Sequence, residues 1–399
     1  MSGEPSQPFV VEVIRVRWQF DFREVSEEEA ARLRQLWERC RVPSAGPGDE
    51  GVEPFVVPSG DPYAVSRAVT LASLERRRGT AMLLHAAGVS DEDRAVALVG
   101  RSGAGKSTAV TVLGRRFGYL TDETVAIEDD GTVSPYPKPV SVITDPGAPW
   151  DKHELSPDEA DLRKPSGPAY LSSVVVLARE ATPSEPSLEP LPLVEALIAV
   201  TGQTSSLPML DRPLERLAEL LSLGGGPYVL RYRDIEDCVD LLADLLAGRV
   251  GGSEREPWFT TPGQARTDIE PAVSDPATGQ AVDRAVDPAH GETGAGGDGP
   301  VDGEANVAAA GSLTDDVRIV RGPWCDALHG EGGSVVLIGD EVVHLGPIGE
   351  VVWGLAAQPV TVGEARTAVI AEFGAHPDGA AIVAEGITAL LDNGVLRRT

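Results

Sequence analysis

The residues best suited to chemistry lie between positions 100 and 108, where the sequence runs Gly-Arg-Ser-Gly-Ala-Gly-Lys-Ser-Thr. The spacing G-x-x-x-x-G-K-S is typical of a loop that wraps the phosphate chain of a nucleotide. Glycines allow backbone conformations that are closed to residues with a Cβ, so successive N–H groups can point at one phosphate chain. The sequence therefore predicts a nucleotide site; a glycine-rich turn with a solvated lysine is the alternative.

Each part of this loop has an expected task. We expect Lys106 to reach the β- and γ-phosphates and Ser107 to ligate Mg²⁺. The helix that follows adds affinity for anions through its N-terminal amides. The predicted phosphate-binding set is Gly100, Arg101, Ser102, Gly103, Ala104, Gly105, Lys106, Ser107 and Thr108.

The segments on either side of the loop predict the elements that must position it. Residues 95–99 (Ala-Val-Ala-Leu-Val) form an apolar run that indicates a buried strand. After the loop, Val110, Leu113 and Phe117 have the spacing of one face of a helix. We therefore expect strand, loop and helix in the order that the motif requires.

Two adjacent carboxylates, Asp122 and Glu123, interrupt an apolar pattern over residues 119–127. An unpaired buried charge is costly, so we expect a compensating partner. Either a metal ion held jointly with Ser107 compensates the charge, or the carboxylates transfer a proton beside the γ-phosphate. The alternative is a turn between two short strands, with both carboxylates in water.

The composition narrows the class of protein. The chain has 399 residues, with 62 acidic and 34 basic side chains and a net charge of −28. So acidic a surface repels DNA, RNA and anionic lipid, and no basic patch is present, so we expect no nucleic-acid or membrane partner. Residues 1–8 lack the features of a signal peptide, and no apolar run approaches the ~20 residues that cross a bilayer.

The three cysteines, Cys40, Cys238 and Cys325, are far apart and form no C-x-x-C pair. Such a set argues against disulfides and against a zinc site. We therefore expect a cytoplasmic protein.

The chain divides into three segments. Residues 1–250 alternate predicted strands and helices, which favours a mixed α/β domain. Residues 9–23 alternate as one half-buried strand, and residues 26–29 form a capping box that opens a helix. Residues 251–311 are rich in Gly, Pro, Ala and Asp, with eleven acidic and three basic residues, and predict a disordered linker. Such a linker would let the flanking domains touch or work apart.

Residues 312–399 predict a small α+β domain. The apolar runs 335–338 and 342–345 flank Gly-Asp-Glu as a hairpin, and helical patterns cover 348–355 and begin at 361 and 377. This order is that of a winged-helix-like domain. Five basic against twelve acidic residues argue against a DNA-binding winged helix.

The central motifs carry a family resemblance. The strand with His85, the glycine-rich loop and the run Leu-Thr-Asp-Glu at 120–123 resemble the HPr kinase family. The run 84–86, the carboxylate pair and residues 135–140 resemble more specifically the HPr-kinase-related proteins encoded beside peptide-tailoring enzymes. The similarity covers roughly residues 80–250, with its core motifs in 80–143. It implies a phosphoenolpyruvate-carboxykinase-like α/β fold and transfer of the γ-phosphoryl of ATP to a hydroxyl.

The resemblance implies roles for individual residues. Lys106 and Ser107 keep their phosphate and Mg²⁺ roles, and Asp122 becomes a second candidate ligand of the metal. Glu123 falls where the family places the aspartate that takes the proton from the acceptor hydroxyl. Because Glu replaces Asp there, either carboxylate could be the base.

Three further side chains are candidates. His85 matches a histidine near the phosphates; a histidine of the core is the alternative. Arg179 and Lys138 are candidates for extra phosphate contacts, with a surface charge as the alternative for each. The chain lacks the I-E-x-R-G-L-G segment with which HPr kinases handle their protein substrate, so HPr is not the expected substrate.

The C-terminal segment is similar to the PqqD-like peptide-binding domains, through the run Gly-Pro-Ile-Gly-Glu-Val-Val-Trp at 346–353. That similarity implies capture of the leader of a ribosomally made precursor peptide, which would add as a strand to an exposed sheet edge.

Together these features predict an ATP- and Mg²⁺-dependent kinase that acts on a hydroxyl or carboxyl of a ribosomally made peptide or a related small substrate. The first alternative is a nucleotide-sensing protein that escorts a peptide without phosphotransfer. An ABC-type ATPase is the second, but no L-S-G-G-Q stretch follows the loop. The acceptor, the choice of ATP or GTP, and a monomer or homo-oligomer stay open.

Overall fold

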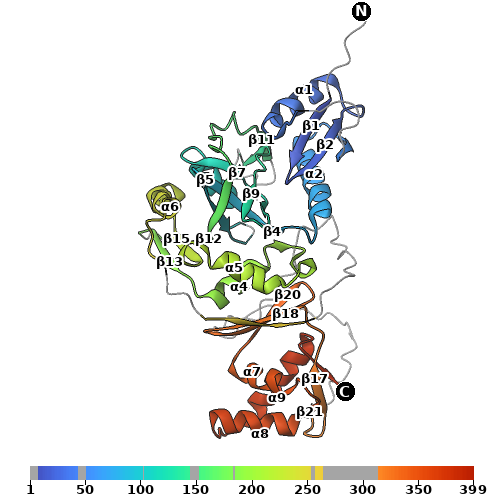
Figure 1. The fold of residues 1–399 in the computed structure, drawn as a ribbon, viewed down its shortest axis with the longest axis vertical. Helices are drawn as coiled ribbons and strands as arrows, with labels where there is room; N and C mark the ends of the chain where they lie inside the picture. The colour runs from blue at the N-terminus through green and yellow to red at the C-terminus, as the bar shows by residue number, and fades with distance from the viewer. Residues whose placement is uncertain are drawn as a thin grey trace, which may run out of the picture.

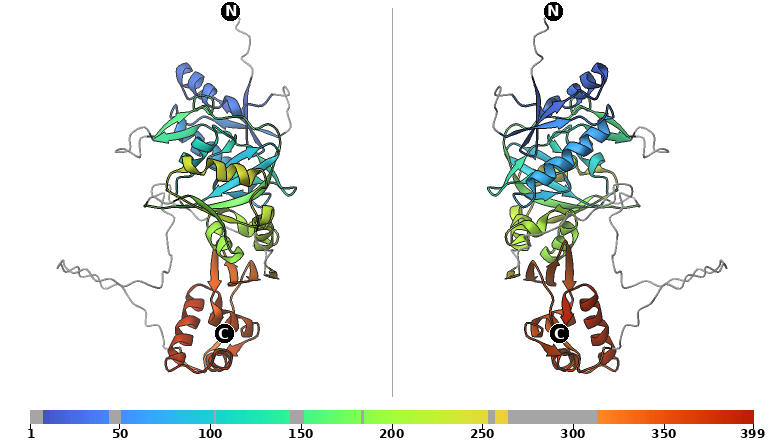
Figure 2. Two further views of the ribbon diagram at one scale, coloured as in Figure 1. Left: turned by 90° about the vertical axis from the view of Figure 1, so that its left-hand side faces the viewer. Right: turned by 90° about the vertical axis from the view of Figure 1, so that its right-hand side faces the viewer.

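The computed structural model describes residues 8–43, 51–101, 103–143, 152–182, 185–252, 257–263 and 313–399. Over these residues the chain forms several sheets and helices of a mixed α/β protein, as the sequence predicted. Figures 1 and 2 show them stacked along one axis, with the C-terminal helices and the N-terminal unit at opposite ends. Within the described ranges, no helix combines the length and the apolar character needed to span a membrane.

The N-terminal unit is a small sheet with two helices. Strands β1 and β2 pair antiparallel, and β2 pairs parallel with β3. The capping box predicted at residues 26–29 is confirmed at the start of α1. The elements are β1 (Phe9–Val13), β2 (Val16–Asp21), α1 (Glu27–Leu36), a 3₁₀ turn η1 (Glu38–Cys40), β3 (Val52–Val56) and α2 (Pro62–Arg77).

The single strand predicted over residues 9–23 is wrong. Ile14 and Arg15 have φ angles of 44° and 65°, and they form a two-residue turn that folds the segment into a hairpin. Positive φ at both positions suits the right-handed twist of a hairpin, although Gly and Asn usually supply it. Complete burial of the Ile14 side chain offsets part of that strain.

The central domain is built on a ten-stranded sheet with the order β14-β4-β8-β9-β12-β6-β5-β7, to which β15 and β13 add beside β12. Its elements are β4 (Met82–Leu84), β5 (Ala86–Asp91), β6 (Arg94–Val99), α3 (Lys106–Leu113), β7 (Gly118–Thr121), β8 (Val125–Ile127), β9 (Thr132–Ser134), β12 (Ala169–Arg179), β13 (Ser187–Pro190), α4 (Leu193–Thr201), β14 (Thr204–Ser205), η2 (Leu207–Met209), α5 (Pro213–Leu221), η3 (Leu223–Gly225), β15 (Tyr228–Tyr232), η4 (Ile235–Cys238) and α6 (Val239–Leu246). A separate hairpin joins β10 (Val140–Ile143) to β11 (Lys152–Leu155).

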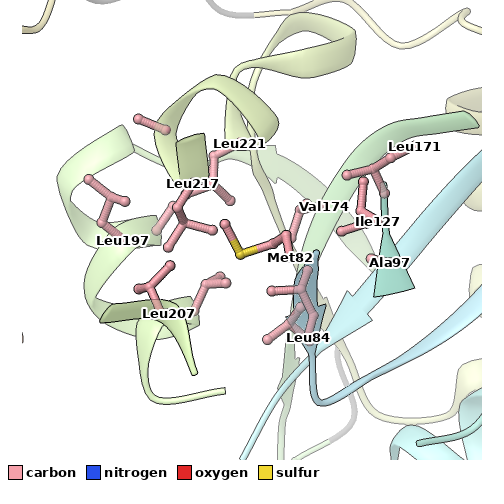
Figure 3. Close-up of a cluster of buried hydrophobic side chains, with 14 of the residues drawn as sticks. Met82, Leu84, Ala97, Ile127, Leu171, Val174, Leu197, Leu207, Leu217 and Leu221 are labelled. Atoms are coloured by element: carbon pink, nitrogen blue, oxygen red, sulfur yellow. The ribbon is translucent and has the colours of Figure 1, made fainter. Parts of the chain in front are cut away.

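Helices cover both faces of this sheet because alternate residues of a strand point to opposite sides. On β6, Ala97 and Val99 pack in the cluster that contains α4 and α5. Val96 and Leu98 pack in the cluster that contains α3 and α6. Figure 3 shows the first cluster, in which Leu197 and Leu217 from the helices face Met82 and its neighbours on the sheet.

The C-terminal module has the predicted hairpin and three helices, with additional strands. Its elements are β17 (Arg318–Arg321), β18 (Asp326–Gly330), β19 (Gly333–Ile338), β20 (Glu341–Leu345), α7 (Pro347–Leu355), β21 (Val360–Thr361), α8 (Val362–Phe373), α9 (Gly379–Asp392) and β22 (Leu396–Arg398). The capping box at 361–364 is confirmed at the start of α8. Strands β21, β17 and β22 form a second small sheet.

Part of the segment predicted as a disordered linker is a strand. Residues Phe259–Pro262 form β16, which pairs antiparallel with β18 and gives the module a sheet of order β16-β18-β19-β20. The prediction of disorder is therefore wrong for these residues. The other residues of the predicted linker that the structure describes are 251, 252, 257, 258 and 263; 253–256 and 264–311 lie outside the described ranges.

The module's sheet packs against the central domain. Leu328, Val335 and Leu337 belong to the same buried cluster as α4 and α5, while Ala327 and Val336 face the module's own helices. Asp326, 1% exposed, accepts hydrogen bonds from the amides of Leu214 (3.0 Å) and Glu215 (3.4 Å) at the start of α5. The module thus supplies an N-terminal cap to a helix of the other domain.

Candidate functional site

The glycine-rich loop lies at the carboxyl end of β6 and leads directly into α3. Gly103 and Gly105 have φ angles of 82° and 93°, in the region that favours glycine. At Gly100, a Cβ would lie 2.8 Å from the Cβ of Ala104, so a side chain would break the loop. The predicted strand, loop and helix are confirmed; Ser102 lies outside the described residues.

Lys106 is held inside this loop. Lys106 is only 8% exposed, and its Nζ donates to the carbonyl oxygens of Gly100 (2.5 Å) and Arg101 (3.4 Å). Burial lowers its pKa below the ordinary value. Ser107 and Thr108 are exposed on the first turn of α3. An ammonium enclosed by the loop and a hydroxyl beside it are the groups that a phosphate chain with Mg²⁺ requires.

The carboxylate pair lies in a turn between two strands. β7 ends at Thr121 and β8 begins at Val125, and the Thr121 hydroxyl accepts from the amides of Glu123 (3.1 Å) and Thr124 (3.2 Å). The turn matches the alternative reading of the sequence, but Asp122 is not in water, because it is only 6% exposed.

Asp122 has two buried partners. Its Oδ1 lies 3.0 Å from the Tyr119 hydroxyl and 3.1 Å from Nζ of Lys138, and Oδ2 lies 3.3 Å from the same ammonium. Glu123 reaches Nζ of Lys138 at 3.5 Å, and its side chain is 32% exposed. The two carboxylates therefore share one buried cation, and Glu123 is the more accessible of the pair.

Lys138 lies in a position that neither alternative from the sequence predicted. It was expected at the phosphates or on the surface, whereas it is 3% exposed beneath the carboxylate pair. Burial alone would lower its pKa, but the charges of Asp122, Glu123 and Glu154 outweigh burial and raise it above the ordinary value. The amine is therefore charged at neutral pH, and the compensating partner predicted for the carboxylates is a lysine of the chain itself.

Glu154 is a further buried carboxyl group whose charge acts on Lys138. It is 7% exposed and accepts from the hydroxyls of Ser66 (2.9 Å) and Ser141 (2.5 Å). Burial raises its pKa above the ordinary value, and the attraction of Lys138 opposes this shift. The spacing of Glu154 in the sequence gave no signal of this contact.

His85 lies between β4 and β5, at the edge of the sheet where the loop lies. Its amide donates to the carbonyl of Gln203 (2.6 Å), and the next amide, of Ala86, donates to the carbonyl of Glu123 (3.1 Å). The residue is exposed, yet the protein around its ring lowers its pKa, first through desolvation and then through the charge of Lys106. His85 is thus a neighbour of the carboxylate pair, and its nearness to phosphate stays a prediction.

The order of the strands explains how these side chains meet. β5 lies beside β6 with Ala86 opposite Val99, and β7 lies on the other side of β5. The start of β5 and the end of β7 therefore reach the edge at which the loop leaves β6. On the opposite flank, β12 and β15 run parallel to β6 and also end at this edge. Carboxyl ends of parallel strands are the usual place for a ligand in such sheets.

The opposite flank adds residues that sequence reasoning missed or left open. The Tyr232 hydroxyl, at the end of β15, donates to the carbonyl of Ala104 in the loop (3.1 Å). Arg179, at the end of β12, donates through Nε to the carbonyl of Arg233 (3.1 Å). Their positions at the ends of predicted strands were the available signal. Arg179 is exposed, as the surface-charge alternative expected, and it lines the hollows beside the loop; its contact with phosphate stays a prediction.

The residues of the loop fit a nucleotide, whereas Ser107 and Asp122 do not fit the metal site that they were predicted to form together. Within the described ranges, no group of three or more His, Cys, Asp or Glu side chains could hold a metal. Mg²⁺ at a phosphate loop needs fewer protein ligands, because phosphate oxygens and water complete its shell. Ser107 is placed for this, whereas Asp122 is unsuited to it because an ammonium already lies 3.1 Å from its carboxylate.

In the C-terminal module, the two edges of the four-stranded sheet differ. The outer edge of β18 is covered by β16, where Phe259 stacks on His329 at 4.6 Å between ring centroids. At the other end of the sheet, β20 pairs with β19 alone among the described strands. A strand from another chain could therefore add at β20.

No protein-family model matches the chain, and no curated protein gives a significant match.

Proposed function

We propose that the protein is an ATP- and Mg²⁺-dependent phosphotransferase with a phosphoenolpyruvate-carboxykinase-like central domain. Its substrate is a hydroxyl or carboxyl of a ribosomally made peptide, or of a related small molecule, and the C-terminal module holds the leader of that peptide. The observation that carries the proposal is the placement of a lysine-containing glycine loop and the Asp122–Glu123 pair at one edge of one sheet.

The loop would bind the phosphates. Amides of the loop and the ammonium of Lys106 would bind the phosphate oxygens and stabilise the negative charge of a transferring phosphoryl group. Mg²⁺ held at the Ser107 hydroxyl would neutralise charge on the β- and γ-phosphates. Lys106 would exchange its bonds to the Gly100 and Arg101 carbonyls for bonds to phosphate oxygens.

Glu123 would be the base. The Asp122 carboxylate is buried and bonded at both oxygens, so it is poorly placed to accept a proton from an incoming hydroxyl. Glu123 is partly exposed and sits beside the exposed His85. Its Oε atoms would orient the acceptor hydroxyl and take its proton. Lys138 would act as a positioning residue that fixes both carboxylates.

The module would present the peptide close to this edge. Strands β19 and β20 pack on α4, and the Gln203 carbonyl, just after α4, accepts a hydrogen bond from the His85 amide. A peptide added at β20 would therefore be held by main-chain hydrogen bonds on a module that is docked rather than freely tethered. Docking raises the local concentration of the acceptor at the site.

The same contact also supports the alternative of a nucleotide-sensing escort. A change at the phosphate site could reach β20 through Gln203 and α4 without any transfer of phosphate. The two functions differ in the fate of the γ-phosphoryl group.

The test uses γ-labelled ATP, Mg²⁺ and peptides encoded by short reading frames beside the gene. A phosphotransferase labels the peptide; Lys106→Ala and Glu123→Gln abolish the label, and Lys164→Ala, an exposed lysine away from the site, keeps it. Label that appears only as free phosphate, with peptide retained on the protein, would favour the escort. Failure of the protein to bind ATP in calorimetry would remove both.

A further inference from the structure

Two hollows lie on the flank of the glycine loop that faces β12 and β15. The smaller, of about 160 Å³, is bounded by Gly105, Thr108, Tyr232 and Ile235. The larger, of about 620 Å³, is bounded by Gly103, Leu177, Ala178 and Glu180. Both share Arg179 and Arg233 in their walls. The volume of the larger one is within the range of about 300–1,000 Å³ that small-molecule sites occupy.

The order of the strands separates these hollows from the catalytic side chains. β6, which carries the loop, lies between β5 and β12. His85, Asp122 and Glu123 are on the β5 side, at the start of β5 and the end of β7. Arg179 and Tyr232 are on the β12 side. A phosphate chain in the loop therefore has one end toward the carboxylates and the other toward the hollows.

The walls of the larger hollow are chemically mixed. The Arg179 guanidinium donates to the carbonyl of Arg233, and Arg233 in turn donates to the carbonyl of Ala181. Leu177 and Ala178 provide apolar surface, and Glu180 provides a carboxylate. Planar guanidinium groups stack on aromatic rings, and carboxylates accept hydrogen bonds from sugar hydroxyls.

Positive charge gathers at the larger hollow, whereas the smaller hollow also has Asp234 and Glu236 in its wall. Arg101, Arg179 and Arg233 all bound the larger hollow, in a protein whose net charge is −28. Arg101 is exposed and has no ion-pair partner among the described residues. Guanidinium groups at this position lie beside a site that would hold a highly charged anion.

We infer that the base and ribose of the bound nucleotide occupy the larger hollow, with the base against the guanidinium groups of Arg179 and Arg233 and the ribose toward Glu180. The inference rests on the proposed function, and it assigns the opposite flank, beside His85 and Glu123, to the phosphoryl acceptor. The smaller hollow, beside Tyr232, then takes the α-phosphate end of the chain.

The test compares ATP with inorganic tripolyphosphate, which has the phosphate chain but neither base nor ribose. Affinities of the full chain for both, with Mg²⁺, are measured by calorimetry. Arg179→Ala removes one wall group, and Ala181→Trp fills the exposed rim with a bulky ring. Arg231→Ala is the matched control, because Arg231 lies on the same strand as Tyr232 but pairs with Glu189 outside the hollow.

We expect Ala181→Trp, which alters only the larger hollow, to bind ATP about tenfold more weakly while its tripolyphosphate affinity changes less than about twofold. Arg179→Ala, whose side chain lines both hollows, should lose more affinity for ATP than for tripolyphosphate. Arg231→Ala should bind both like the wild type, and Lys106→Ala should lose both. Unchanged ATP affinity in both hollow variants would place the base elsewhere and leave the proposed function standing. An equal loss of ATP and tripolyphosphate would make the hollow a phosphate site and overturn the inference. If the wild type binds neither probe, the proposed function falls, and the inference with it.

Discussion

Lys138 offers the sharpest test of how the candidate site is held together. Its ammonium lies 3.1 Å from Asp122 and 3.5 Å from Glu123, in a place where Lys138 and Asp122 have side chains only 4% exposed. At 3.1 Å, the attraction between unit charges is about 5 kcal/mol for an effective dielectric of about 20. Loss of hydration by both ions consumes much of this attraction, so the net value of the pair is smaller.

Removing only one partner is a different matter. In Lys138→Met, the Asp122 carboxylate would stay buried with the Tyr119 hydroxyl as its remaining partner among the described side chains. A buried charge that has lost its counterion costs about 3–5 kcal/mol of stability. We therefore expect Lys138→Met to lower the free energy of unfolding by about 3–5 kcal/mol, and Asp122→Asn to lower it by less, because Lys138 keeps Glu123 at 3.5 Å. The double variant should lose less than the sum, with a coupling of about 2–3 kcal/mol.

The assay is urea unfolding followed by tryptophan fluorescence. One of the six tryptophans, Trp37, is a buried ring whose centroid lies 6.4 Å from that of Tyr136. Arg76→Met is the control, because Arg76 forms its ion pair with Glu53 on the surface. That variant should keep the midpoint of the wild type. If Lys138→Met also keeps the midpoint, or if the two single effects simply add, the buried pair does not hold the turn and the reasoning is refuted.

Three further predictions concern the docking of the module and the histidine. Asp326→Ala should destabilise the protein by about 1–3 kcal/mol, because it leaves two amides of α5 without an acceptor; thermal melting would show it, and a melt like that of exposed Asp392→Ala would contradict it. Leu328→Ala, in the core shared by the two domains, should cost about 2–5 kcal/mol and make residues 257–263 more sensitive to protease; no change in either would argue against docking. The lowered pKa of His85 means that the unfolded chain binds its proton at higher pH, so stability falls as pH drops below about 6.5. His85→Gln should remove part of that decline, and the rest should remain because the pKa of His329 is also lowered. An unchanged pH profile of the melting temperature in this variant would contradict the prediction.

The division of labour between the two carboxylates follows from their surroundings rather than from their order in the chain. Asp122 is bonded to Tyr119 and Lys138 and is almost fully buried, whereas Glu123 keeps a third of its side chain in contact with solvent. This difference is the reason why we propose Glu123, rather than Asp122, as the base, with Asp122 as a fixed anion that holds Lys138. The longer side chain of Glu also reaches further from the turn than Asp would.

The glycine loop was predictable because its signal is local. The spacing of Gly100, Gly105 and Lys106 encodes the backbone conformation directly, and the flanking patterns specify the strand and helix. The capping boxes of α1 and α8 were predictable for the same reason, since the cap and its partner are three residues apart. The expectation that His85 and the carboxylates belong to one site came from a family resemblance, not from the spacing of these residues.

Local signals also misled in two places. Alternation with a period of two runs through Ile14 and Arg15, so the hairpin looked like one strand, and only burial of Ile14 makes its positive φ tolerable. Residues 259–262 lie in a segment whose composition is that of a disordered chain, but they complete the edge of a sheet formed far along the sequence. The composition of a segment does not show whether a strand elsewhere in the sequence will pair with it.

Only the tertiary structure decided where the charged side chains belong. Lys138 and Asp122 are 16 residues apart, and Asp326 caps a helix 112 residues away, so neither contact has a pattern that spacing could reveal. Whether a lysine is buried or solvated depends on whether the fold brings anions to meet it, because the cost of desolvation is recovered only by such partners. The sequence determined by itself that a glycine-rich loop joins a strand to a helix, and folding determined which anions, which cation and which hollow surround it.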